Sequence, residues 1–301
     1  MPKDNTGREL KFYRYALMRA PWLMKAAWGA QKVLLLFTPV HRCKHETAHV
    51  LRDDGSVLNI DVFEPRTRRT RGKRLPTLLY FHGGGFGFEA APHHKKLMAV
   101  YAKRADCRVA CPDYGLLPDA VYPAPRLDAD KACEWLLNNY GGMPYAVGGD
   151  SAGGAIAFYA FADAEAKPSL AMLLYPVTDC EMKTESMKKY TDTPMWNAVN
   201  NRCMWETYLS GGFDSEASPM QMTLPEKLPD IYIETAQFDC LHDEGVNFAR
   251  RLAEAGAEVE ITQTLGTVHG YDIALWSPLV RACVKKRVAA LKKAFVNQNN
   301  K

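Results

Sequence analysis

The sequence of 301 residues is 47% hydrophobic and 24% charged, which is ordinary for a globular protein with a large buried core. Its formal net charge of +4 is too small to indicate a nucleic-acid partner. The first residues carry too many charges for a signal peptide, and the eight cysteines form no C-x-x-C pair, so we expect reduced thiols in a cytoplasmic protein.

Helices are predicted for residues 1–40, followed by a β-hairpin. The most apolar stretch, 21–40, is interrupted by two lysines, so we expect no stable insertion into a membrane. The hairpin is predicted over 44–51 and 56–63, because Asp53-Asp54-Gly55 is a strong turn sequence between two runs of strand character.

From residue 77 onward, short apolar strands alternate with helices. The strands are predicted over 77–81, 108–114, 145–148, 170–177, 230–236 and 259–265. The helices of this part are predicted over 152–164, 244–255 and 278–295. Such alternation predicts an α/β fold in one domain spanning 1–301, with a mostly parallel central sheet and helices on both faces.

One segment, 179–227, interrupts the alternation. It is rich in Met, Trp and Tyr and has no strand pattern. A connection of this length without strands is usually functional, so we expect a lid or a binding element here.

Two glycine-rich motifs carry the strongest functional signal. Residues 149–153 read G-D-S-A-G, which fits the G-x-S-x-G turn that exposes a nucleophilic serine between a strand and a helix. Residues 82–85 read H-G-G-G, a loop that supplies backbone N–H groups to an oxyanion hole. Because both motifs follow predicted strands and occur in this order, we predict that Ser151 is a nucleophile.

A serine hydroxyl needs a general base, and the base needs a carboxylate that holds its tautomer. In chain order the acid and then the histidine follow such a serine. Only His242 and His269 follow Ser151, and His269 comes just after the predicted strand 259–265. We therefore predict that His269 is the base.

Two aspartates after the predicted strand 230–236 are candidates for the acid. Asp239 lies nearer to the strand end, so we assign it the orienting role. Asp243 and Glu244 have the positions of cap and first-turn residues of the next helix, and we assign Asp243 to capping.

The oxyanion of a tetrahedral intermediate needs N–H donors that are already in place. We expect these donors to be the backbone N–H groups of Gly83, Gly84 and Ala152. Ala152 begins the helix after the serine, and glycine lets the backbone of the loop approach closely.

With these residues identified, the chain resembles the hormone-sensitive-lipase-like branch of the α/β-hydrolase superfamily, the small bacterial-type carboxylesterases. The similarity covers roughly 77–275 and includes two more motifs. The sequence D-Y-G-L-L-P-D at 113–119 resembles the family's D-Y-R-L-A-P-E, and D-C-L-H-D-E-G at 239–245 resembles its D-P-L-x-D-E-G. Gly115 and Cys240 depart from the arginine and proline that are usual there.

The resemblance implies a catalytic triad of Ser151, Asp239 and His269, and a cap formed by 1–45 and 179–227. It implies a serine carboxylic-ester hydrolase, a short-chain esterase that acts on small-molecule esters through an acyl-enzyme. Water is then the second substrate, and no metal or organic cofactor is expected. A homodimer is one arrangement that the sequence leaves open.

Three alternatives remain open. A carbohydrate or xenobiotic deacetylase could use the same triad, and a hydrolase fold could serve as a non-catalytic ligand-binding protein. The third is a zinc peptidase, because residues 45–49 read H-E-x-x-H. That motif needs a helix, whereas on the predicted strand His45 and His49 would lie about 13 Å apart. The His93-His94 pair is expected to be a surface feature at a helix start.

Overall fold

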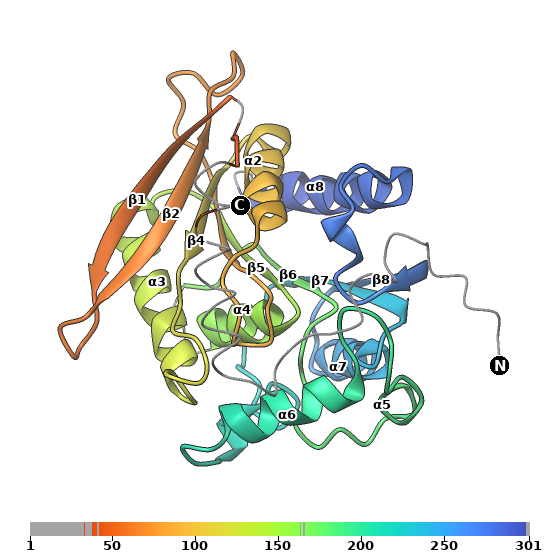
Figure 1. Cartoon of the computed structure of the whole chain (residues 1–301). Coiled ribbons are helices and arrows are strands. Elements are labelled where there is room, and N and C mark those ends of the chain that lie inside the picture. Colours follow the sequence, from red (N-terminus) through yellow and green to blue (C-terminus); the bar gives the residue numbers. More distant parts are fainter. Residues whose placement is uncertain (1–32, 34–37, 41, 163, 165, 299–301) are drawn as a thin grey trace.

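The computed structural model describes residues 33, 38–40, 42–162, 164 and 166–298 (Figure 1). The helices predicted for 1–40, and with them most of the expected cap segment 1–45, lie outside these residues. Within the described part, no helix is long and apolar enough to cross a membrane.

Among the described residues, eight strands form one sheet in the order β1-β2-β4-β3-β5-β6-β7-β8. They are β1 (Cys43–Leu51), β2 (Val57–Pro65), β3 (Thr77–Phe81), β4 (Arg108–Pro112), β5 (Tyr145–Asp150), β6 (Leu170–Leu174), β7 (Asp230–Phe238) and β8 (Val259–Val268). The first three strands in this order pair antiparallel, and all later pairs are parallel. The predicted hairpin and the mostly parallel sheet are confirmed.

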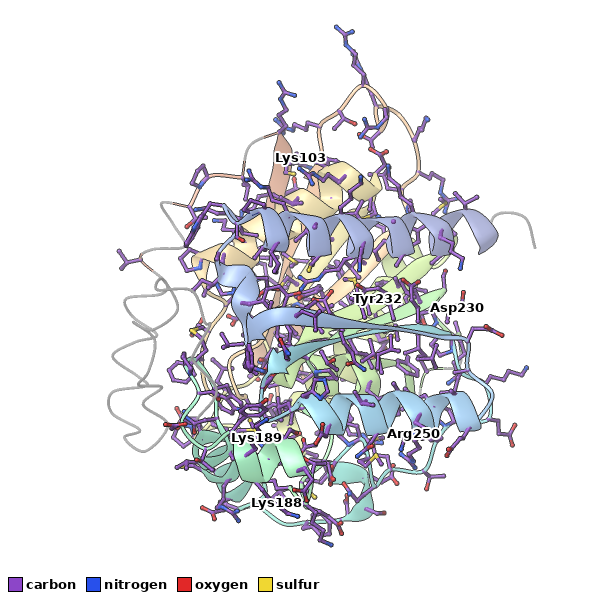
Figure 2. The ribbon with its side chains drawn as sticks, turned by 90° about the vertical axis from the view of Figure 1, so that its right-hand side faces the viewer. Lys103, Lys188, Lys189, Asp230, Tyr232 and Arg250 are labelled. Carbon is purple, nitrogen blue, oxygen red and sulfur yellow. The ribbon has the colours of Figure 1, made fainter. Side chains whose placement is uncertain are left out.

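Helices cover both faces of the sheet, as predicted, and the sheet separates two apolar cores. The long helices are α2 (Pro92–Ala105), α3 (Ala124–Tyr140), α4 (Ala152–Ala162), α7 (His242–Glu254) and α8 (Pro278–Gln298). Side chains of α2 and α8 pack in one core, and those of α3, α4 and α7 pack in the other. Viewed from the β8 edge, α8 and α7 lie on opposite sides of the sheet (Figure 2).

The central strands are short and buried along their whole length. Every residue of β3, β5 and β6 is buried. Such continuous burial is typical of parallel strands that helices cover on both faces. Because these strands run parallel, their carboxyl ends meet at one edge of the sheet. The motifs identified in the sequence lie at this edge.

The insertion 179–227 contains no strand, as expected. It folds into α5 (Glu185–Lys189), α6 (Ala198–Tyr208) and the short helix η2 (Ser215–Ala217). The side chains of Thr184 and Asn197 cap α5 and α6 by accepting backbone N–H bonds, which explains where these helices begin. Both helices lie on the side of the molecule that carries α7 (Figure 1).

Candidate active site

Ser151 lies on a strained turn between β5 and α4. Its φ of 56° is in the left-handed region, which is unfavourable for a residue with a side chain and costs about 1–3 kcal/mol. The turn is held by the neighbouring strand: Ser151 N–H donates to the carbonyl of Leu174 at 2.9 Å, and Val177 N–H donates to the carbonyl of Ser151 at 3.0 Å. In this conformation the Ser151 hydroxyl lies within hydrogen-bond distance of His269.

The glycines of the G-D-S-A-G motif allow this turn to pack against its neighbours. A Cβ on Gly149 would lie 2.1 Å from the carbonyl oxygen of Gly153. A Cβ on Gly153 would lie 2.1 Å from the carbonyl oxygen of Phe81, at the end of β3. Because both contacts are with backbone, no side chain could be accommodated at either position.

His269 follows β8 directly and reaches the serine. Its Nε2 lies 2.7 Å from Ser151 Oγ, and its Nδ1 lies 2.7 Å from Asp239 Oδ2. The Asp239 carboxylate keeps the imidazole proton on Nδ1, so the lone pair on Nε2 accepts a hydrogen bond from the Ser151 hydroxyl. The three side chains are buried, and Asp239 is fully so.

Asp239 follows β7 and has a second partner that fixes its carboxylate. Its Oδ1 accepts the backbone N–H of Leu241 at 3.0 Å, while Oδ2 faces His269. The register between β7 and β8 shifts between Ala236 and Phe238, and Phe238 pairs with Val268. This irregularity brings the residues after both strands, Asp239 and His269, side by side.

The role assigned to Asp243 is corrected by the structure. The N-cap position of α7 is Leu241, and Asp243 lies within the first turn, two residues later. Its Oδ2 instead accepts the backbone N–H of Ser186 at 2.8 Å, so it ties α7 to α5 of the insertion. His242, the other histidine after Ser151, pairs with Asp243 through Nδ1 at 2.9 Å.

The H-G-G-G loop follows β3 and lies next to the serine turn. Among the described residues, neither Gly83 nor Gly84 donates its backbone N–H to another group. Gly84 has a φ of +135°, and a Cβ there would lie 2.7 Å from the carbonyl oxygen of Phe88. Ala152, the third expected donor, is the first residue of α4, where backbone N–H groups have no partner within the helix.

A second carboxylate lies beneath this loop and was not identified from the sequence. Asp150 is buried and accepts hydrogen bonds from Tyr80 Oη at 2.8 Å and His94 Nε2 at 3.2 Å. Burial raises the pKa of the Asp150 carboxyl, whereas the hydrogen bonds from His94 Nε2 and the Tyr80 hydroxyl lower it. A Cβ on Gly83 would collide with this carboxylate at 2.2 Å, so glycine is required there by Asp150.

The expectation that His94 is a surface residue is wrong. His94 is buried in the first turn of α2, and its Nδ1 accepts the backbone N–H of Ala91 at 2.9 Å. An imidazole that accepts at Nδ1 and donates from Nε2 to Asp150 is neutral, with its proton on Nε2. The pair H-H at a helix start gave no sequence signal for this, because Asp150 lies 56 residues away.

Side chains from the insertion and from the residue that follows β6 pack around His269. The ring of Tyr175 meets the imidazole edge-on at 4.9 Å between centroids, and Trp196 lies at 6.0 Å. Met195 Cε lies 3.4 Å from the position that a Cβ on Gly270 would take. The insertion therefore packs directly against the loop that carries the histidine.

The H-E-x-x-H motif lies on β1, an edge strand of the sheet. His45 Nε2 pairs with Asp61 at 3.1 Å and His49 Nδ1 with Asn59 at 2.8 Å, both on β2. A strand places the two imidazoles too far apart for one metal ion. In the described part of the chain, no three His, Cys, Asp or Glu side chains are arranged to hold a metal.

Known proteins are similar to this chain, some in sequence and some in fold. A family model for the alpha/beta hydrolase fold matches residues 78–273. Carboxylesterase NlhH of Mycobacterium tuberculosis is 32% identical over 237 residues, which cover 73% of this chain and 74% of that protein. Ethyl acetate hydrolase of Pseudomonas putida is 28% identical over 231 residues, or 72% of each chain. The matched range contains Ser151, Asp239 and His269.

Solved structures with lower sequence identity share the architecture. A bacterial heroin esterase has a TM-score of 0.86 at 24% identity, covering 97% of this chain and 98% of that one. Esterase LipW from Mycobacterium marinum has a TM-score of 0.85 at 23% identity, with coverage of 97% and 96%. These similarities concern the fold alone.

Proposed function

This chain belongs to the alpha/beta hydrolase family, and we propose that it hydrolyses carboxylic esters of small molecules through an acyl-enzyme on Ser151. The family predicted from the sequence is thereby confirmed, and the curated relatives are carboxylesterases, the predicted enzyme class. One observation carries the mechanistic part of the proposal: two contacts of 2.7 Å link Ser151 Oγ, His269 and Asp239 in a row.

In the proposed first half-reaction, Ser151 Oγ attacks the ester carbonyl while His269 Nε2 takes the hydroxyl proton. The N–H groups of Gly83, Gly84 and Ala152 stabilise the oxyanion of the tetrahedral intermediate. Asp239 stabilises the imidazolium that forms, and the proton then passes from Nε2 to the departing alkoxide.

In the second half-reaction, water takes the place of the alcohol. His269 removes a proton from the water, whose oxygen attacks the acyl carbonyl, and the same N–H groups hold the second oxyanion. Collapse of this intermediate releases the carboxylic acid and returns the proton to Ser151. Every step uses groups of the chain, and none requires a cofactor.

The proposal includes a cap and a preference for short acyl chains. Residues 179–227 form the part of the cap that lies among the described residues, and Met195 and Trp196 of this segment pack on the His269 loop. An enclosed pocket limits acyl length, because each methylene contributes about 0.8 kcal/mol only where it fits. We propose acyl groups of roughly two to eight carbons.

A cytoplasmic location is also part of the proposal. All eight cysteines are free thiols, which suits a reducing compartment. The homodimer considered from the sequence stays a prediction.

The acyl-enzyme is tested by active-site titration. Purified protein mixed with excess nitrophenyl acetate should release a burst of nitrophenol of about one equivalent per chain. Mass spectrometry of the acid-quenched protein should place the acetyl group on Ser151, and the Ser151→Ala variant should give neither the burst nor the label. A folded wild-type protein without a burst or turnover on any ester would instead identify a non-catalytic ligand-binding protein.

The acyl preference is tested by measuring kcat/KM for nitrophenyl esters from acetate to palmitate. We expect the maximum at or below about eight carbons and no increase in rate at the substrate's micelle concentration. A maximum at long chains would contradict the enclosed pocket. Hydrolysis of sugar acetates in preference to simple esters would identify the deacetylase alternative.

A further inference from the structure

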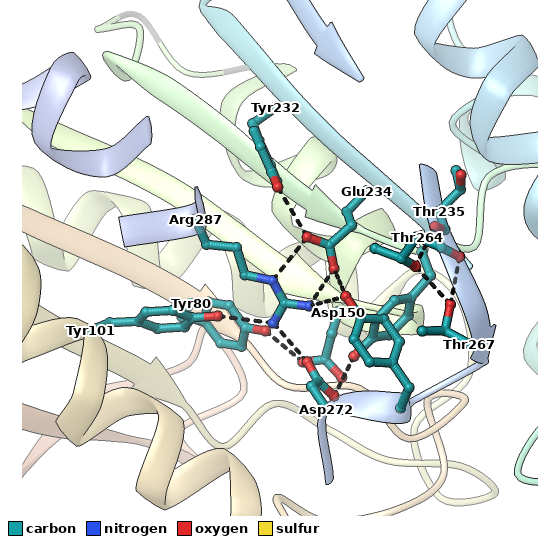
Figure 3. Close-up of polar contacts among 12 residues, drawn as sticks. Tyr80, Tyr101, Asp150, Tyr232, Glu234, Thr235, Thr264, Thr267, Asp272 and Arg287 are labelled. Carbon is teal, nitrogen blue, oxygen red and sulfur yellow. Dashed lines mark hydrogen bonds and ion pairs between the residues drawn. The ribbon is translucent and has the colours of Figure 1, made fainter. Parts of the chain in front are cut away.

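The C-terminal helix α8 places a fully buried arginine beneath the candidate active site. Arg287 is 0% exposed and lies between β7, α2 and the segment that follows His269 (Figure 3). An arginine is rarely buried unless each of its N–H groups is paired. The proposed reaction requires no cation at this position. The reason for burying Arg287 must therefore lie in the groups that its guanidinium binds.

All five N–H donors of Arg287 have an acceptor. Two go to Glu234 on β7, from Nε at 3.2 Å and from Nη2. Nη1 donates to Asp272 Oδ2 at 2.8 Å and to Tyr101 Oη at 3.2 Å, and Nη2 also donates to Tyr271 Oη at 3.1 Å. A planar guanidinium with five donors matches this set, whereas the three donors of a lysine do not.

The carboxylates are equally well satisfied. Glu234 accepts from Tyr232 Oη at 3.0 Å and from Tyr271 Oη, besides the guanidinium. Asp272 accepts from Tyr175 Oη at 2.7 Å through its second oxygen. A buried polar network in which every member is paired adopts one arrangement and resists displacement.

Three partners of Arg287 lie on the segments next to two of the site residues, Asp239 and His269. Glu234 lies on β7, the strand that leads into Asp239. Tyr271 and Asp272 follow His269 by two and three residues, in the short helix η3 (Tyr271–Ile273). Both segments therefore make their contacts with the same guanidinium.

The third connection runs through Tyr175. This residue follows Leu174, whose carbonyl accepts the backbone N–H of Ser151, and its own φ of 35° directs the ring toward His269. Its hydroxyl donates to Asp272. The Tyr175 side chain thus joins the imidazole ring to the network, and its backbone continues from the residue that holds the serine turn.

We propose that Arg287 is a positioning residue that holds the His269 loop in register with Asp239. It acts through Asp272, Tyr271 and Glu234 and touches neither the substrate nor the reacting atoms. This inference rests on the proposed function, because it concerns the precision of the same serine–histidine–aspartate contacts. Catalysis depends steeply on such precision, and a misplacement of about 1 Å can cost on the order of a hundredfold in rate.

The first test is Arg287→Lys, which keeps the positive charge but removes the planar guanidinium with its five N–H donors. We expect kcat for nitrophenyl acetate to fall on the order of a hundredfold while KM changes little, because the acyl pocket is untouched. The matched control is Leu291→Ala, which removes a fully buried side chain one turn further along the same helix, outside the network. This control should lose stability and keep kcat.

The second readout does not depend on substrate. A proton held between an imidazole and a buried carboxylate gives a strongly downfield proton NMR signal, here that of His269 Nδ1–H. We expect this signal in the wild type and in Leu291→Ala, and its broadening through exchange in Arg287→Lys. If the wild type shows the signal but hydrolyses no ester, the proposed function fails while the positioning role is still measurable.

Two milder variants keep the proposal testable if Arg287→Lys does not fold. Tyr175→Phe keeps the ring beside His269 and removes only the bond to Asp272, and Asp272→Asn keeps the size of its side chain. Each should lower kcat and broaden the downfield signal, and the two together should be non-additive because both disturb the contact between Tyr175 and Asp272. Folded variants with unchanged kcat and an unchanged signal would overturn the proposal.

Discussion

Two buried histidine–carboxylate pairs lie close to the same serine, and they differ in one partner. His269 donates from Nδ1 to Asp239, and its Nε2 faces the hydroxyl of Ser151. His94 donates from Nε2 to Asp150, and its Nδ1 faces the backbone N–H of Ala91. Each imidazole is neutral and is held in one tautomer by a carboxylate.

The third group decides what each pair can do. A serine hydroxyl that loses its proton becomes a nucleophile, whereas a backbone amide gives up its proton far less readily and serves only as a structural donor. His94 therefore anchors the start of α2 to the turn that carries Ser151. A buried imidazole–carboxylate contact alone is no sign of catalysis, and the group on the other ring nitrogen has to be examined.

The largest difference between the pairs should appear when each histidine is removed. His269→Ala should lower kcat by about a millionfold, the loss that follows removal of a triad base. His94→Ala should keep most of its activity and lower the free energy of unfolding by about 1–3 kcal/mol, because Asp150 loses a buried donor. Ester kinetics and urea denaturation of both variants measure this. A folded His94→Ala that is as inactive as His269→Ala would remove the distinction.

The carboxylates should differ in the same way, with a smaller effect. Asp239→Asn should cost about 10⁴ in kcat, because an amide favours the wrong tautomer of His269. The matched control is Asp243→Asn, four residues on, which should lower stability by about 1 kcal/mol or less and leave kcat nearly unchanged. Steady-state kinetics of the two variants decide between them, and reversed losses would make Asp243 the orienting acid.

The smallest effect should come from a third histidine, His82, whose titration makes the free energy of unfolding depend on pH. Burial lowers the pKa of His82 to about 4. Because an unfolded histidine titrates near 6.5, the unfolded chain binds a proton that the folded chain does not. This contribution to stability is complete above about pH 6.5 and is lost as the pH falls toward 4, by up to about 1.4 kcal/mol per pH unit.

The measurement is urea denaturation of wild type and His82→Gln between pH 4 and 7. Glutamine keeps an N–H donor for the carbonyl of Gly83, with which His82 Nδ1 makes contact at 2.8 Å. The variant should lose less stability per pH unit on the acid side. Parallel curves for the two proteins would show that His82 is not the group that titrates.

The sequence was sufficient to predict those parts of the candidate site that depend on local backbone conformation. The turn at Ser151 needs glycine at 149 and 153, because backbone atoms occupy the space of a Cβ, and this requirement leaves a readable motif. His269 and Asp239 could be assigned because chain order and strand ends limited the choice. The structure places the two side chains in contact, at 2.7 Å between His269 Nδ1 and Asp239 Oδ2.

The parts that the sequence did not predict depend on contacts between distant segments. His94 and Asp150 are 56 residues apart, and Arg287 and Tyr101 are 186 apart. No periodicity or spacing records such a pairing, and a buried arginine on a helix rich in lysine resembles a solvated one. The N-cap of α7 was misassigned for a related reason, since the Asp243 carboxylate accepts the backbone N–H of Ser186 in the insertion and none from its own helix.

The buried network also bears on how the chain is made. Arg287 follows Glu234 by 53 residues, so at the usual pace of translation β7 exists for roughly 3 to 10 s before its cation is synthesised. During that interval Glu234 is an inward-pointing charge on an incomplete sheet, which opposes pairing with strands of other chains. A charge at this position of β7 therefore disfavours aggregation of the incomplete sheet until α8 supplies the guanidinium.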